Sequence, residues 1–139
     1  MKLTALSSLL RPLVVVMLLH AGIAGAQDGV RKQVFLVVDG DRLVASNVRT
    51  NGFDELRLDA RERIMQSEEG EGVIVVVTNQ RLIAYGAASG WSSRDLNTGE
   101  AVESLTADDY AGMFVTNKRM LNFNGETGVW GERQRRTGN

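Results

Sequence analysis

The chain of 139 residues contains no cysteine, one proline and one histidine. Without cysteine, a disulfide-stabilised domain and a cysteine nucleophile are excluded. Pro12 and His20 both lie near the N-terminus, so the remaining residues have neither proline nor histidine. A Ser-His-Asp triad and the usual zinc and copper ligands are therefore excluded from that part of the chain. We expect no metal, no cofactor and no enzymatic activity.

Residues 1–26 have the order of a secretory signal peptide. Lys2 and Arg11 supply positive charge, an apolar run follows, and small residues end at Ala26. The apolar run is shorter than the roughly 20 residues that span a bilayer. We predict cleavage before Gln27, export to the periplasm or the cell exterior, and no membrane span in the mature protein.

The mature protein is predicted to be one domain over residues 27–132 with a disordered basic tail over 133–139. Removal of the leader takes away Lys2 and Arg11, which leaves 14 Lys and Arg residues against 17 Asp and Glu residues. This balance does not indicate a nucleic-acid partner. A domain of this size without disulfides must be stabilised by packing or by association with another chain.

Three segments of the mature chain resemble one another. They read VVDGDRLVAS at 37–46, VVTNQRLIAY at 76–85 and FVTNKRMLNF at 114–123. The arginines that they share recur at a nearly constant spacing, and an aromatic residue follows each arginine after ten or eleven positions; these residues are Arg42, Arg81 and Arg119, then Phe53, Trp91 and Trp130. A constant spacing of about 38 residues is typical of repeat architectures.

Each unit predicts β-strands. Apolar β-branched runs at 34–38 and 73–77 are followed by turn residues, a returning strand, and a strand that begins near the aromatic residue. Acidic-apolar segments that begin at Glu62 and Glu100 predict a fourth strand. The sequence thus predicts an all-β fold of three tandem β-meander repeats of about 38 residues. The third unit would lack its fourth strand, which residues 30–33 or a second chain would supply.

Residues 35–131 resemble the blades of bacterial exported β-propeller-like repeat proteins. The resemblance rests on an apolar strand, the motif Thr-Asn-x-Arg-x-hydrophobic, and a Trp or Phe about ten residues later. Residues 78–82 and 116–120 match this motif, whereas 39–42 read Asp-Gly-Asp-Arg. The resemblance implies a propeller-like fold and no particular activity. Three blades are fewer than the four to eight that normally close a ring.

Other folds compete with the propeller. A β-prism or β-trefoil is also built from three units of similar length, but the usual lectin sequence motifs do not occur. Pleckstrin-like domains carry one similar strand pair but end in an amphipathic helix, whereas this chain repeats the pair and ends in a polar segment. Only residues 59–65 are compatible with a short helix.

The repeated arginines and tryptophans are the candidate ligand-binding residues. Arg42, Arg81 and Arg119 would bind carboxylates or sulfated glycans through bidentate hydrogen bonds. The alternative is that each arginine pairs with a neighbouring acidic residue. Trp91 and Trp130 would stack on sugar rings or fill the space between repeats.

The acidic residues give little indication of a catalytic or metal-binding site. Glu62 and Glu100 occupy equivalent positions, and we expect both to lie on solvated strands rather than to act as an acid and a nucleophile. Asp39-Gly40-Asp41 is expected to form a hairpin turn rather than a calcium site.

These observations favour an exported non-enzymatic binding or assembly module. The alternatives are a small carboxylate-dependent glycan hydrolase and a purely structural envelope protein. We expect a homodimer formed through the open sheet ends, with an envelope polymer or another protein as the alternative partner.

Overall fold

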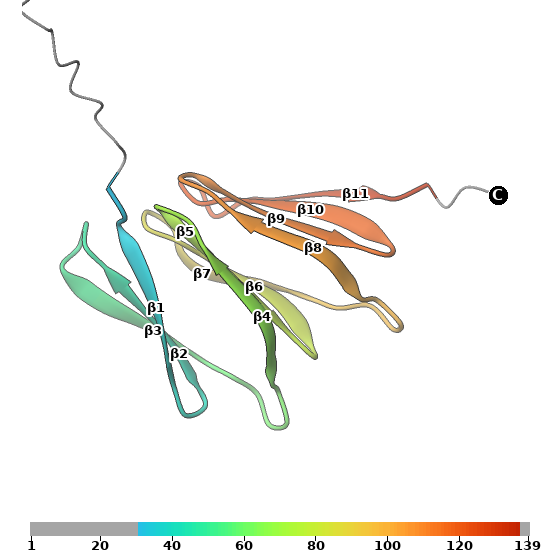
Figure 1. The fold of residues 1–139 in the computed structure, drawn as a ribbon, viewed down its shortest axis with the longest axis horizontal. Helices are drawn as coiled ribbons and strands as arrows, with labels where there is room; N and C mark the ends of the chain where they lie inside the picture. The colour runs from blue at the N-terminus through green and yellow to red at the C-terminus, as the bar shows by residue number, and fades with distance from the viewer. Residues whose placement is uncertain (1–30, 137–139) are drawn as a thin grey trace, which may run out of the picture.

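The computed structural model describes residues 31–136, so the predicted signal peptide lies outside the described residues. Those residues form eleven β-strands arranged in three antiparallel sheets (Figure 1). The all-β prediction is confirmed. In residues 31–136 we find no helix that is long and apolar enough to cross a membrane.

Each sheet is a meander in which successive strands are neighbours. The first sheet contains β1 (Val34–Asp39), β2 (Arg42–Asn47) and β3 (Gly52–Arg57). The second contains β4 (Ile64–Glu69), β5 (Val73–Thr78), β6 (Arg81–Gly86) and β7 (Gly90–Asp95). The third contains β8 (Val102–Ala107), β9 (Ala111–Thr116), β10 (Arg119–Asn124) and β11 (Trp130–Gln134).

The acidic-apolar strands belong to the sheet that follows them. β4 pairs with β5 and β8 pairs with β9, so each opens a new sheet instead of closing the previous one. The third sheet therefore has four strands, while the described part of the first sheet has three. Our prediction that the third unit lacks a strand is wrong. Residues 59–63 form a connection without a helix, in which Arg61 has a positive φ of 65°.

The two ends of the described chain also differ from expectation. The backbone N–H of Gln33 donates to Glu71 O at 2.6 Å, so this residue contacts the turn between β4 and β5, not the third sheet. Val30 lies outside the described residues. At the other end, β11 continues to Gln134 and the N–H of Arg135 donates to Lys118 O at 2.8 Å. The ordered sheet thus extends past residue 132, where we expected the tail to begin.

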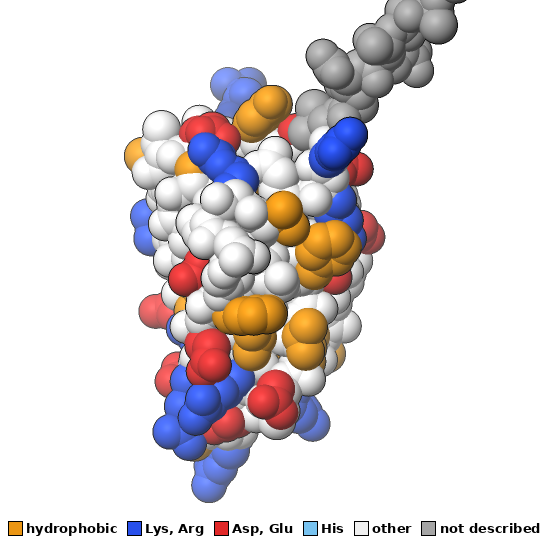
Figure 2. Space-filling model, turned by 90° about the vertical axis from the view of Figure 1, so that its left-hand side faces the viewer, with side chains coloured by type: hydrophobic (Ala, Val, Ile, Leu, Met, Phe, Trp, Pro, Cys, Tyr) orange, Lys and Arg blue, Asp and Glu red, His pale blue; other side chains and the backbone are white. Residues whose placement is uncertain are grey.

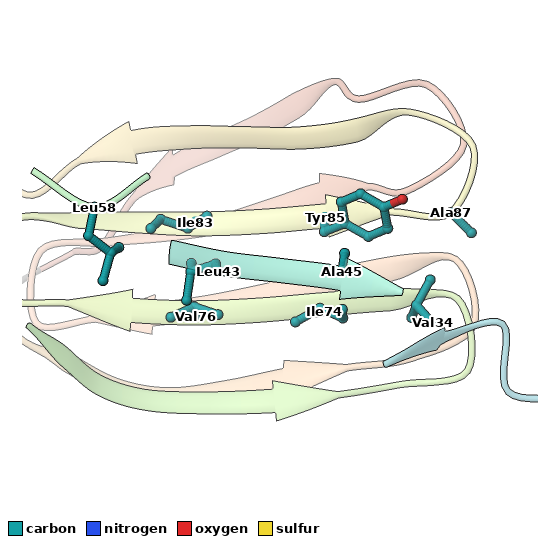
Figure 3. Packing of buried hydrophobic residues seen from close by; sticks show 9 residues of the cluster. All are labelled: Val34, Leu43, Ala45, Leu58, Ile74, Val76, Ile83, Tyr85 and Ala87. Carbon is teal, nitrogen blue, oxygen red and sulfur yellow. The ribbon is translucent and has the colours of Figure 1, made fainter. Parts of the chain in front are cut away.

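The second sheet lies between the other two, and both of its faces are buried. Its strand β5 reads VIVVVT and is buried at every position. Because successive side chains of a strand point to opposite faces, such a run supplies two cores. Toward the first sheet, Ile74, Val76 and Tyr85 pack with Val34, Leu43 and Ala45 (Figure 3). Toward the third sheet, the packed residues are Val73, Val75, Leu82, Ala84, Phe114, Leu121 and Phe123.

Glycine allows the second and third sheets to approach closely. A Cβ on Gly86 would lie 2.2 Å from the carbonyl oxygen of Gly125, and a Cβ on Gly112 would lie 2.4 Å from Val75 Cγ1. Neither position has room for a larger residue without a shift of the backbone or of the packed valine. These glycines therefore set the spacing of this interface.

Candidate functional site

Arg81 is bound inside the protein by a carboxylate. Its Nε donates to Glu62 Oε1 at 2.8 Å and its Nη2 donates to Glu62 Oε2 at 3.0 Å. The same Nη2 also donates to the carbonyl of Arg57, at the end of β3, at 3.1 Å. The Glu62 side chain has no exposed surface. This arginine therefore links the second sheet to the first.

The other residues of the Thr-Asn-x-Arg motif hold the same connection. Thr78 Oγ1 donates to Glu62 Oε1 at 2.7 Å, and Asn79 Oδ1 accepts from the N–H of Arg63 at 2.7 Å. The motif thus fastens the segment between the first and second sheets to the turn between β5 and β6. This is why β4 starts on the second sheet.

The third sheet repeats this arrangement. Arg119 donates to Glu100 at 2.8 and 3.1 Å, and Thr116 Oγ1 donates to Glu100 Oε1 at 2.7 Å. Arg119 also reaches the carbonyl of Asp95, at the end of β7, at 2.7 Å. Arg81 and Arg119 therefore lie in internal ion pairs, which is the second of our two interpretations. Our expectation that both glutamates lie on solvated strands is wrong.

The environment keeps both glutamates ionised. Burial alone would raise the pKa of Glu62, but hydrogen bonds from Arg81, from the N–H of Asp59 and from Thr78 outweigh it and lower the pKa. The pKa of Glu100 is lowered in the same way. A carboxylate of this kind has no proton to donate at neutral pH, which is unfavourable for a general acid.

Arg42 differs from the other two arginines because it is exposed. Its Nη1 donates to Glu55 Oε2 at 2.7 Å, and about half of each side chain is accessible to solvent. The adjoining Asp39-Gly40-Asp41 forms the predicted hairpin turn, with a positive φ of 59° at Gly40. No group of three acidic, histidine or cysteine residues that could hold a metal occurs in residues 31–136.

Both tryptophans contact the preceding sheet. Trp91 Nε1 donates to Asp54 O at 3.0 Å, and Trp130 Nε1 donates to Ser92 Oγ at 2.8 Å. The Trp130 ring lies 5.2 Å from the Phe123 ring, centroid to centroid. Both side chains are half-buried between sheets, not displayed together on one surface.

A polar cluster between the first and second sheets was not predicted. Asn47 Nδ2 donates to Tyr85 Oη at 2.7 Å and to Ala87 O at 2.9 Å, and Tyr85 Oη donates to Asp54. Burial, together with the Asp54 carboxylate, raises the pKa of Tyr85 to about 12. The sequence does not single out this cluster, because the position of Asn47 is Gly86 in the second unit and again an asparagine, Asn124, in the third.

The first sheet has an outer face that no other sheet covers. In the register of β1, β2 and β3, Phe35 lies opposite Ser46, which lies opposite Phe53, and Val37 lies opposite Val44. We call these five residues the first outer face. Phe35, Val37 and Phe53 are 43%, 51% and 72% exposed, and hydrophobic side chains gather on this side of the molecule (Figure 2).

The third sheet has a corresponding uncovered face. Met113 pairs with Asn122, Asn122 pairs with Gly131, and Met120 pairs with Arg133. These five residues form the second outer face. They line a hollow of about 450 Å³, together with Leu121 and Glu132. Met113 and Met120 are 51% and 37% exposed. Neither outer face was predicted from the sequence.

Comparisons with known proteins do not place the chain in a family. No family model and no curated protein matches it. One similar solved structure is the N-terminal domain of Nup159, with a TM-score of 0.36 and 14% sequence identity over 73% of this chain. The match covers 30% of the length of that chain.

Proposed function

We propose that this chain is an exported, non-enzymatic assembly module that binds through its two outer faces. The observation that carries the proposal is the exposure of apolar side chains on opposite ends of the row of sheets. Contiguous exposed apolar surface is typical of interaction sites. The arginines and tryptophans of the second and third sheets are occupied by contacts within the chain, so the outer faces offer more surface for a partner.

The arrangement of the sheets supports a propeller-like architecture for this module. The strand direction turns progressively from the first sheet to the third (Figure 1). The contacts of Trp91 with the first sheet and of Trp130 with the second are alike, as expected for neighbouring blades. In this proposal the chain is an open row of three blades, and its two end faces are the surfaces used for assembly.

Methionine footprinting tests the proposal without knowledge of the partner. Met113 and Met120 lie on the second outer face, while Met65 on β4 is 65% exposed and lies on neither face. In the exported fraction of the native cells, we expect mild oxidation to modify Met65 and to spare Met113 and Met120. Oxidation of all three methionines in the order of their exposed fractions would contradict the proposal.

A separate assay tests the absence of enzymatic activity. We expect no turnover with a panel of glycosidase and esterase substrates. Robust turnover that is abolished by Glu62→Gln or Glu100→Gln, in protein that remains folded, would contradict the proposed assembly module and support a carboxylate-dependent hydrolase.

A further inference from the structure

We infer that the first outer face binds the second outer face of another copy of this chain, in a head-to-tail contact. This inference rests on the proposed assembly function and names the partner. It depends on a correspondence between the exposed outer faces and the two interfaces already buried within the chain.

The first outer face corresponds to faces that are buried in the other two sheets. When Arg42 is aligned with Arg81, Phe35, Val37 and Val44 correspond to Ile74, Val76 and Ile83. The second-sheet residues are fully buried against the first sheet. The same position as Ile83 in the third sheet is Leu121, which is buried against the second sheet. The first outer face is therefore the one member of this series without a sheet against it in the described chain.

The second outer face corresponds to the opposite side of each sheet. When Arg119 is aligned with Arg81, Met113 and Met120 correspond to Val75 and Leu82, which are buried against the third sheet. In the first sheet, the position of Leu82 is occupied by Leu43, which is buried against the second sheet. At each internal interface, a face equivalent to the first outer face packs against a face equivalent to the second outer face. The two outer faces are therefore one of each type.

The aromatic residue of each unit fixes how the two outer faces would meet. Trp91 contacts Asp54 and Trp130 contacts Ser92, each on the last strand of the preceding sheet. Asp54 and Ser92 each directly follow the aromatic residue of their own unit, and the equivalent residue of the third unit is Gly131. Gly131 lines the hollow of the second outer face. The remaining aromatic residue is Phe53, which is 72% exposed. We therefore place Phe53 of one copy in the hollow of the other.

A charged residue of the second outer face fits the same placement. Arg94 of β7 lies over the Trp130 ring, with its guanidinium carbon 5.5 Å from the ring centroid. Arg133 follows Trp130 at the same distance in the sequence at which Arg94 follows Trp91, and it lines the hollow. In the assembled pair, Arg133 would lie over the ring of Phe53 from the second copy and form a cation–π contact.

Head-to-tail contacts between copies either close into a ring or continue into a filament. If a twofold axis relates two copies, both pairs of outer faces are used and the two sets of three sheets form one ring. Such a ring would have six sheets, three from each chain. Six is within the range of four to eight blades found in known propellers. We infer this closed dimer.

Light scattering coupled to size-exclusion chromatography tests the inference on the purified mature protein. We expect twice the mass of one chain at micromolar concentration. Phe53→Asp and Met120→Asp should each raise the dissociation constant about thirtyfold or more, because each puts a charge into the centre of an apolar contact. Met65→Asp is the matched control, since Met65 is 65% exposed and lies on neither outer face. Circular dichroism checks that every variant remains folded.

The outcomes separate the inference from the proposed function. A wild-type monomer, or a dimer that survives both outer-face substitutions in folded protein, would overturn the inference. A filament with the same sensitivities would support the head-to-tail contact and overturn the closed ring. A wild-type monomer whose Met113 and Met120 are nevertheless protected in the exported fraction would overturn the second copy as partner and leave the assembly function standing.

Discussion

Removal of the buried carboxylate at Glu62 should strongly destabilise the protein. In Glu62→Ala, the Arg81 guanidinium, whose side chain is only 15% exposed, loses its ion pair. The Thr78 hydroxyl and the N–H of Asp59 lose an acceptor at the same time. Breaking a buried pair by removing one partner costs about 3 to 5 kcal/mol. Arg81 keeps its bond to the Arg57 carbonyl, so we expect about 3 kcal/mol.

The assay is equilibrium unfolding in urea, followed by tryptophan fluorescence. A domain of this size has a free energy of unfolding of about 5 to 15 kcal/mol, so the loss should lower the urea midpoint clearly. Glu62→Gln keeps an acceptor for Thr78 but removes the charge, and we expect it to cost less than Glu62→Ala. Glu100→Ala should also destabilise the protein, but by less than Glu62→Ala, because Arg119 keeps an ion pair with Glu132 at 3.0 Å.

The chain also provides a matched control. Glu55 pairs with Arg42 in an exposed ion pair, and such pairs contribute about 0 to 1 kcal/mol. If Glu62→Ala lowers the free energy of unfolding no more than Glu55→Ala does, the glutamate and arginine of the motif do not hold the sheets together. Our explanation of the Thr-Asn-x-Arg motif would then be refuted.

Four further predictions follow from the structure and the sequence. Because the pKa values of the two buried glutamates are lowered from 4.5, their stabilisation should be complete at neutral pH and should be lost as the pH falls below about 4.5 in acid-unfolding curves. Trp130→Ala should cost about 3 kcal/mol in urea unfolding, whereas Phe53→Ala, measured in dilute monomer, should cost less than about 0.5 kcal/mol; equal costs would contradict the assignment of Phe53 to an uncovered face. Gly86→Ala should cost about 1 to 3 kcal/mol because its Cβ would meet a carbonyl oxygen, and an unchanged midpoint would mean that the sheets are not held this closely. The intact mass of exported material should correspond to a chain that begins at Gln27, and a chain in the membrane fraction that retains residues 1–26 would contradict cleavage.

The strands could be predicted from the sequence, but their assignment to sheets could not. Runs such as Val73–Val77, with Thr78-Asn79 after them, have the residue types of a strand and a hairpin turn. A periodic sequence, however, does not say where one sheet ends and the next begins. That boundary depends on the ion pair between Glu62 and Arg81, which binds the connecting segment to the second sheet.

The first and second outer faces could not be predicted from the sequence for a related reason. Phe35 and Val37 have the same apolar character as Ile74 and Val76, so the sequence gives no sign that the first pair is exposed and the second buried. Exposure here depends on whether another sheet lies against that face. Among the described residues, this property is fixed by the position of a unit at the end of the row and not by its own composition.

Cross-linking between two singly substituted chains tests the central claim, that the two outer faces meet head-to-tail. Ser46 and Asn122 correspond to Tyr85 and Ala84. Tyr85 belongs to the same core as Ala45, the first-sheet equivalent of Asn122, and Ala84 belongs to the same core as Phe123, the third-sheet equivalent of Ser46. Since the chain contains no cysteine, Ser46→Cys and Asn122→Cys each introduce one thiol. Treated with a short bismaleimide, a mixture of the two variants should give a cross-linked pair with one chain of each type, while each variant alone should give none. Cross-linking of Ser46→Cys to itself, or no cross-linking in the mixture at concentrations where the protein is dimeric, would contradict the head-to-tail contact.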